Sequence, residues 1–301
     1  MSTADALHAA AVGHELAGTV EEGLALLEPA LRDAAPPELW LQRARLLAQL
    51  ARFDPRRQDD ALAAALAAQD AAERSGDPAA RAAALLVVAQ VHYRWAQLAD
   101  DGDFEPALEL SRRALALAEG VGDDRLVSEA AHRVGLVHER KRELPEAHAQ
   151  HSRAHALAEA GGHALEQAHA ARHLGFLAFF LHGDPDAALA RFEESLALFE
   201  AAGCRFVLPV AWQTVGTAHF LGRNDPVRAE PCYRRGLALA EELGRPLVVA
   251  ELLSSLAELL AATGRTEEAR AAYARCAACA EAVGHRRQAD AAAAKLAALG
   301  G

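Results

Sequence analysis

The feature that most constrains this chain is a glycine that returns about every 40 residues. The series is Gly122, Gly162, Gly203, Gly244 and Gly284, with spacings of 40, 41, 41 and 40 residues. Each glycine follows a segment rich in Ala, Leu and Glu, such as RRALALAEG, and a left-handed glycine commonly ends a helix. A period of this length predicts an array of similar stacked units.

A second series marks where helices begin. It consists of Pro106, Pro145, Pro185 and Pro226, which are spaced 39, 40 and 41 residues apart. Proline fits the first turn of a helix because its missing N–H would have no partner there. Since the two series interleave, each period is predicted to hold two helices of about 15 to 17 residues joined by tight turns.

A third series lies inside the first helix of each pair. Gly135, Gly175 and Gly216 each stand 13 residues after a helix-ending glycine. A glycine in the middle of a helix costs about 1 kcal/mol relative to alanine, so its recurrence predicts a close crossing of two helices. The second helix offers a small residue at the matching point, namely Ala107, Ala147, Ala188, Ala229 and Ala269.

The composition agrees with an all-α chain and argues against several classes of function. Ala, Leu, Glu and Arg, which favour helix, lead the composition. The net charge of −11 disfavours binding to nucleic acid or to an acidic membrane surface. No stretch is apolar for long enough to span a membrane, and the N-terminal segment lacks the basic region of a signal peptide. We therefore expect a cytoplasmic location.

The sequence contains no motif that indicates catalysis. The cysteines at positions 204, 232, 276 and 279 form no disulfide framework, and Cys276 and Cys279 are expected to pack in a helix rather than to serve redox or zinc chemistry. There is no nucleophile motif, phosphate loop or paired-carboxylate motif. The chain is predicted not to be an enzyme, and no cofactor or metal is expected.

The order of small and aromatic residues across each helix pair resembles the tetratricopeptide repeat. Matching copies read VGLVHERKRELPEAHAQHSRAHAL, VGTAHFLGRNDPVRAEPCYRRGLAL and LAELLAATGRTEEARAAYARCAAC. Trp212 stands at the opening aromatic position of its copy, and Phe192, Tyr233 and Tyr273 stand at the aromatic position of the second helix. The copies exceed the common 34-residue unit by about six residues, which resembles the long variant frequent in bacterial regulators.

The resemblance implies an all-α fold, a right-handed α-solenoid of about seven antiparallel helix pairs. The pairs are expected at residues 4–36, 37–78, 79–124, 125–164, 165–206, 207–246 and 247–287. Residues 288–301 are expected to form a polar-faced capping helix, which repeat arrays need at their ends. Residues 1–301 are thus predicted to form a single domain.

The resemblance also implies where a partner would bind. In such arrays the first helices line a concave surface, and five positions on one face of each first helix make most of the contacts. The candidate groove residues are Tyr93, Arg94, His132, Leu136, Glu139, Arg140, His169, Arg172, Phe176, Phe179, Phe180, Gln213, Thr217 and Phe220.

The segment RHLGFLAFFLHG in the fifth pair holds three of the nine phenylalanines, Phe176, Phe179 and Phe180. We expect at least two of them to line the groove, with the seam between neighbouring pairs as the alternative place. Aromatic residues and arginine are typical interface anchors, and arginine can bind a carboxylate with two hydrogen bonds. The predicted partner is a protein or peptide segment with an apolar anchor and an acidic group. Alternatively, the arginines belong to a solvated, ion-paired face.

Nine of the fourteen histidines lie between residues 132 and 182. His169 and His173 form an HxxxH pair, a spacing that can hold zinc, but the pair lacks the glutamate of HExxH and has no cysteine nearby. His151 falls at the aromatic position of a second helix, where a ring fills the core. The histidines are therefore predicted to pack in the core, with metal binding or pH sensing as the alternative.

Two functions follow from the predicted architecture. The first is a non-catalytic adaptor or scaffold that holds a peptide or protein segment in the concave groove. The second is a sensor, in which a peptide or small molecule changes the superhelix and acts in trans on a transcription or signalling partner. A histidine-rich metalloprotein or enzyme is a third, less favoured interpretation.

Overall fold

A computed structural model describes residues 2–32, 35–52, 54–98 and 102–300, so both ends of the predicted domain, residues 1 and 301, lie outside the described residues. The described residues form helices and no strand. None of these helices is long and apolar enough to cross a bilayer. The helices are α1 (Thr3–Ala17), α2 (Val20–Leu27), η1 (Ala30–Arg32), α3 (Pro37–Ala51), η2 (Pro55–Arg57), α4 (Gln58–Ser75), α5 (Pro78–Leu98), α6 (Glu105–Val121), α7 (Asp124–Arg140), α8 (Leu144–Gly161), α9 (Ala164–Phe180), α10 (Pro185–Ala201), α11 (Leu208–Thr217), η3 (Ala218–Gly222), α12 (Pro226–Glu242), α13 (Pro246–Ala262), α14 (Thr266–Ala282) and α15 (Arg286–Ala298).

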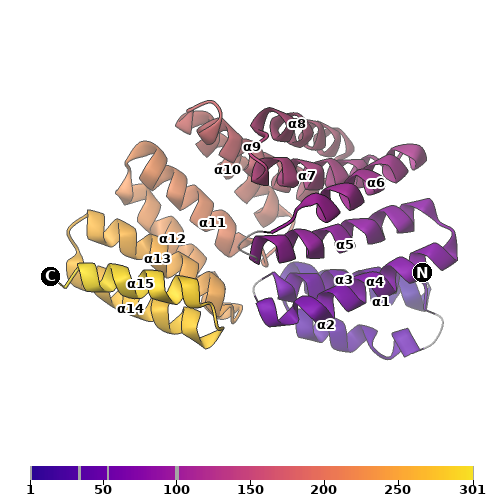
Figure 1. Cartoon of the computed structure of the whole chain (residues 1–301), viewed down its shortest axis with the longest axis horizontal. Helices are drawn as coiled ribbons and strands as arrows, with labels where there is room; N and C mark the ends of the chain where they lie inside the picture. The colour runs from indigo at the N-terminus through magenta and orange to yellow at the C-terminus, as the bar shows by residue number, and fades with distance from the viewer. Residues whose placement is uncertain (1, 33–34, 53, 99–101, 301) are drawn as a thin grey trace.

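The α-helices follow one another as seven pairs in a curved array (Figure 1). Each odd-numbered helix from α1 to α13 packs on the even-numbered helix that follows it, and also on helices of the adjacent pairs. Helix α15 packs on α14 and covers the C-terminal end of the array. The predicted all-α solenoid of about seven helix pairs with a capping helix is confirmed.

The predicted helix ends are confirmed as well. All five repeated glycines have positive φ, from 63° at Gly244 to 73° at Gly284. The four repeated prolines lie in the first turns of α6, α8, α10 and α12. Glycine and proline therefore end and begin the helices at the points that the spacing indicates.

A second left-handed position recurs in the turn inside each of the last four pairs. It is occupied by Arg142, Gly183, Asn224 and Gly264, whose φ values are 63°, 64°, 52° and 76°. Glycine adopts this conformation freely, whereas another L-residue pays about 1–2 kcal/mol for it. The sequence pattern did not reveal this position because two of its four occupants are not glycine.

Replacing Arg142 by glycine is expected to raise the free energy of unfolding by up to about 1 kcal/mol. Relief of the left-handed strain should exceed the cost of the more flexible glycine in the unfolded chain. The matched change Arg113→Gly, at an exposed position within α6, should instead lower the free energy by about 1 kcal/mol. Urea unfolding of both variants measures the shifts, and a destabilised Arg142→Gly protein would contradict this expectation.

The mid-helix glycines lie where the two helices of a pair cross. A Cβ atom on Gly175 would lie 2.5 Å from the ring of Phe192, and one on Gly135 would lie 2.6 Å from the ring of His151. Gly216 repeats the arrangement in the sixth pair. Cβ contacts below 3.0 Å are essentially never seen, so the predicted close crossing is confirmed. His151 fills the place that an aromatic ring fills in the next two pairs.

The array curves far enough for the first pair to meet the sixth (Figure 1). The backbone N–H of Phe206, before α11, donates to the carbonyl of Leu16 in α1 over 3.3 Å. A Cβ atom on Gly18 would lie 3.2 Å from both Leu243 and Arg245, in the turn between α12 and α13. We call this contact between the early and late pairs the closing seam.

Candidate functional site

Polar side chains join the first helices of successive pairs. Arg133 of α7 donates to the side-chain oxygen of Gln90 in α5 over 2.8 Å. In the later pairs, Gln213 of α11 donates to the hydroxyl of Ser255 in α13 over 3.0 Å. The predicted groove residue Gln213 is therefore engaged with the next pair.

Three of the predicted arginines, Arg94, Arg140 and Arg172, form no ion pair with any carboxylate in the part of the chain that the structure describes. Their hydrogen-bond partners are neutral groups, namely the Arg52 carbonyl and Gln97 for Arg94, the Tyr93 hydroxyl for Arg140 and the His173 ring for Arg172. By contrast, Arg133 and Arg45 both approach the carboxylate of Glu129. These three guanidinium groups thus carry charge without a local counter-charge in contact.

Several arginine side chains lie close enough to Arg52 to affect its charge. Burial, together with the nearby charges of Arg172 and Arg94, lowers the pKa of the Arg52 guanidinium to about 9. Glu251 of α13 opposes that shift, and burial raises the pKa of Glu251 itself. We call Arg52, Arg94, Arg140 and Arg172 the arginine cluster. It is a local positive surface on a protein of net charge −11.

The three clustered phenylalanines of α9 divide between the seam and the surface. The ring of Phe176 meets that of Phe192 at 5.0 Å between centroids, and both Phe176 and Phe179 are partly buried against the core shared by α9, α10 and α11. Phe180, at the end of α9, is 70 % exposed. Leu221 of η3 is also exposed, at 63 %. The seam interpretation therefore describes Phe176 and Phe179, whereas Phe180 is open to a partner.

Two predicted groove residues lie in the interior instead. Leu136 is 8 % exposed and His132 is 9 % exposed. The sequence-based assignment of these two to an open groove is wrong, because α7 is flanked by the first helices α5 and α9 on either side. The close approach of these helices covers positions that a wider array would leave open.

The remaining predicted groove residues are half-buried and contact neighbouring aromatic rings or hydroxyl groups. Tyr93 packs edge-on against Phe104 with centroids 5.5 Å apart, and the Thr217 and Tyr233 hydroxyls lie 3.2 Å apart. Two further predicted groove residues also pack against their neighbours. His169 packs edge-on against Phe199, and Phe220 packs on the core of the last two pairs.

Four histidines from three helices form a buried cluster, which we call the histidine cluster: His132 of α7, His151 of α8, and His169 and His173 of α9. The Nδ1 atoms of His132 and His151 lie 3.2 Å apart. The carboxylate of Glu139 lies beside it, with its oxygens 2.9 and 3.0 Å from Nδ1 of His173. The sequence analysis missed this association because it examined each helix separately.

Burial disfavours the charged form of three of these histidines, His132, His169 and His173. It lowers the pKa values of His132 and His169 well below the usual range, helped by neighbouring histidines and arginines respectively. Burial also lowers the pKa of His173, although Glu139 opposes the shift. Burial alone would raise the pKa of Glu139, but its histidine neighbours outweigh this and hold it below the usual range. At neutral pH we therefore expect neutral imidazoles at His132, His169 and His173 beside an ionised Glu139 carboxylate.

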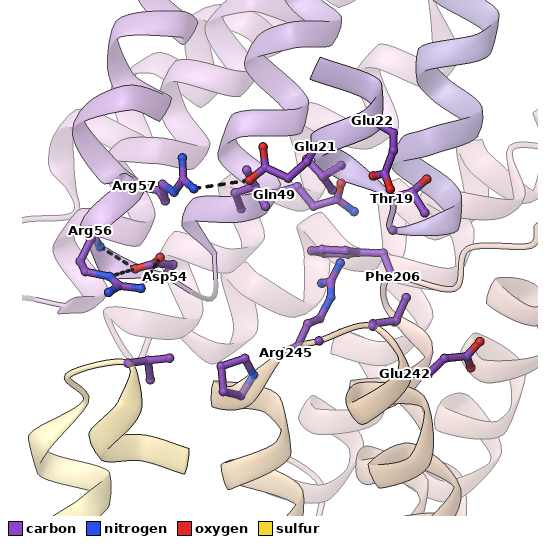
Figure 2. Close-up of a pocket in the computed structure, with 17 residues that line it drawn as sticks. Thr19, Glu21, Glu22, Gln49, Asp54, Arg56, Arg57, Phe206, Glu242 and Arg245 are labelled. Carbon is purple, nitrogen blue, oxygen red and sulfur yellow. Dashed lines mark hydrogen bonds and ion pairs between the residues drawn. The ribbon is translucent and has the colours of Figure 1, made fainter. Parts of the chain in front are cut away.

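A pocket of about 600 Å³ lies at the closing seam (Figure 2). The early pairs contribute the turn after α1, the end of α3 and the residues around η2, and the late pairs contribute Phe206 and the turn between α12 and α13. The Arg245 guanidinium lies over the Phe206 ring at 3.6 Å from its centroid, and Figure 2 shows Arg245 reaching toward that ring. The periodic sequence pattern carries no signal for this pocket, because its walls come from distant repeats.

No protein-family model matches the chain, and its sequence matches no curated protein. Solved structures do match its fold. BtubC from P. vanneervenii is 19 % identical, with 87 % of this chain and 91 % of that chain covered and a TM-score of 0.57. A Rap protein complexed with Competence and Sporulation Factor is 15 % identical, with 98 % and 97 % covered and a TM-score of 0.58.

A third match carries the repeat in its description. It is a signal-transduction ATPase from Pyrococcus horikoshii with a tetratricopeptide repeat sensor, 12 % identical, with 91 % of this chain and 42 % of that chain covered and a TM-score of 0.57. At these identities the likeness concerns the fold alone. The chain accordingly has a tetratricopeptide-type helical repeat fold, as the order of its small and aromatic residues indicated.

Proposed function

We propose that this protein is a non-catalytic binding module that holds a peptide or protein segment on the inner face of its first helices. The observation that carries the proposal is the arginine cluster. Arg94, Arg140 and Arg172 project from three successive first helices, and in the described structure none of them contacts a carboxylate. An acidic group of a partner would supply the missing counter-charge.

The electrostatics of the cluster favour such a partner. Arg172 and Arg94 both disfavour the charged form of Arg52, so the cluster is under mutual repulsion. A carboxylate in its midst would reverse the sign of that interaction, and charged hydrogen bonds of this kind are worth about 1.5–3 kcal/mol each. The acidic character of the rest of the chain would meanwhile repel an acidic segment from other surfaces.

The apolar part of the proposed partner would bind at the end of α9. Phe180 is largely exposed, and Leu221 of η3 is exposed beside the same fifth-to-sixth pair junction. The guanidinium of Arg172 lies 5.5 Å from the centroid of Phe176, over its ring. An apolar side chain on Phe180 and a carboxylate at Arg172 would therefore be bound by one and the same helix.

The comparisons support a binding role rather than a catalytic one. The similar Rap protein was solved complexed with Competence and Sporulation Factor, and the similar ATPase carries its repeats as a sensor. We propose that the present chain acts likewise as a single domain, in the cytoplasm, as an adaptor or as a regulator of a partner protein. The net charge of −11 argues against nucleic acid as that partner.

A selection experiment tests the proposal without knowledge of the natural partner. The immobilised protein is used to select from a displayed library of random 12-residue peptides, beside the variant Arg94→Gln/Arg172→Gln. We expect peptides enriched in Asp or Glu next to an aromatic or aliphatic residue from the wild type, and no such enrichment from the variant. Enrichment of the same peptides by both proteins would contradict the proposal.

The closing-seam pocket favours a second candidate, the sensor. A ligand in this pocket would touch both the early and the late pairs. Among the described residues these pairs also meet through the 3.3 Å backbone hydrogen bond from Phe206 to Leu16 and through side-chain packing around Gly18. Ligand binding would therefore change how tightly the superhelix closes. This candidate predicts that a ligand is located at the seam rather than on the arginine cluster.

A further inference from the structure

Three side chains from three different helices converge beside the first helices of the fourth and fifth pairs. They are Glu139 of α7, His151 of α8 and His173 of α9, and one potential ligand atom from each lies within 4.8 Å of the others. Oε1 of Glu139 lies 3.1 Å from Nε2 of His151 and 2.9 Å from Nδ1 of His173. Two nitrogens and one oxygen thus surround a common point.

One atom of this set points to a missing ligand. His151 is fully buried, and its Nε2 makes no well-formed hydrogen bond among the described residues. Its one close polar approach is to Oε1 of Glu139 at 3.1 Å, which helps to lower the pKa of that carboxyl group. A buried polar atom without a partner costs about 1–3 kcal/mol. The opposite ring atom, Nδ1, lies 3.2 Å from Nδ1 of His132. That contact can hold the His151 proton on Nδ1 and leave the Nε2 lone pair available.

We propose that Glu139, His151 and His173 bind a divalent transition metal ion, with Zn²⁺ as the best fit. Two imidazoles and one carboxylate are a common zinc ligand set that leaves a fourth position open. Atoms bound tetrahedrally to one zinc at about 2.0–2.1 Å lie about 3.4 Å apart. The separations of 2.9 and 3.1 Å from Glu139 are close to that value, and all three ligand atoms lie within 4.8 Å of one another.

The surrounding charges are compatible with a bound cation. The site provides two imidazole nitrogens and a carboxylate oxygen, which are ligand types that zinc prefers. Binding at Nδ1 of His173 moves the ring proton to Nε2, where Nη2 of Arg172 now lies 3.3 Å away. Arg172 must then turn away from the ring. The positive charge of Arg172 would weaken the binding of a metal cation, and the negative charge of the Glu139 carboxylate would offset that repulsion.

The ion would connect α7, α8 and α9 and so fix the fourth pair to the fifth. The inference does not depend on peptide binding, because it rests on the positions of Glu139, His151 and His173 and not on the arginine cluster. Metal binding can therefore fail while the peptide proposal stands, and the reverse also holds.

Zinc titration of tag-free protein tests the site, with His151→Phe as the decisive variant. Phenylalanine should keep the fold, because Phe192 occupies the equivalent position against Gly175 in the next pair. The control His148→Phe makes the same change on the same helix, at a half-buried histidine that faces His182 instead. Affinity is read from competition with a chromophoric chelator, and thermal unfolding shows that each variant is folded.

We expect one zinc per wild-type and His148→Phe chain, and an affinity at least about 100-fold lower in His151→Phe, since loss of a ligand should exceed the 10–100-fold effect of losing a supporting residue. Glu139→Gln should behave like His151→Phe. Cobalt(II) in the wild type should show the visible absorption of a tetrahedral site. Equal zinc affinity in the wild type and His151→Phe, or no binding by the wild type at micromolar zinc, would overturn the proposal.

Discussion

Replacing Gly175 by valine is expected to lower the free energy of unfolding by about 3 kcal/mol or more. The first added carbon would already lie 2.5 Å from the ring of Phe192, and the Phe192 side chain is 5 % exposed and packs edge-on against Phe176. Overfilling a packed core costs about 1–3 kcal/mol for small additions, and valine adds three carbons at a point where the helices already touch. Urea unfolding followed by circular dichroism measures the loss.

A matched control separates crowding from helix propensity. Gly13 lies in the middle of α1 with no atom within 4 Å of a Cβ built on it, so Gly13→Val should change the free energy by less than about 0.5 kcal/mol. In the double variant Gly175→Val/Phe192→Ala, the free energy of unfolding should fall by less than the sum of the two single decreases, because removing the Phe192 ring makes room for the valine. Strict additivity would contradict the crossing contact.

Removing two guanidinium groups of the arginine cluster is expected to lower the affinity for a selected acidic peptide by about 100-fold or more. Replacing Arg94 or Arg172 removes a charged hydrogen bond to the peptide worth about 1.5–3 kcal/mol. In the free protein, each replacement also removes the repulsion that the arginine exerts on Arg52. Binding to Arg94→Gln/Arg172→Gln should also depend less on salt than binding to the wild type. Fluorescence anisotropy at two salt concentrations measures both effects.

The control variant removes the same number of charges from the second helices. Arg153 of α8 and Arg234 of α12 are exposed and paired to Glu119 and Glu230. Arg153→Gln/Arg234→Gln should bind the peptide within about threefold of the wild type, because exposed pairs contribute little. A similar loss in both double variants would indicate a general charge effect and not a site.

The sequence was sufficient to predict the repeats and their phase. Gly122 ends a helix and Gly175 marks a crossing for local steric reasons, so each leaves a signal in the spacing. The left-handed turn inside each of the last four pairs escaped notice because Arg142 and Asn224 occupy it at a cost in strain. The π-helical turn η3 after α11 likewise has no counterpart in the pattern.

The candidate site was harder to predict, because it depends on how tightly the array curves. The curvature buries Leu136 and brings Phe206 to Leu16, and such contacts between distant repeats leave no periodic trace. The search for metal ligands along single helices likewise omitted Glu139, whose partners His151 and His173 come from the next two helices.

The location of a bound peptide tests the central claim most directly. A selected acidic peptide carrying a photoreactive phenylalanine analogue at its apolar position is cross-linked to the wild-type protein, and the attachment sites are read by mass spectrometry. The account predicts attachment to the first helices α5, α7 and α9, close to Phe180 and Arg172. Attachment to the closing seam would favour the sensor, and attachment to the second helices α6, α8 or α10 would contradict the assigned surface.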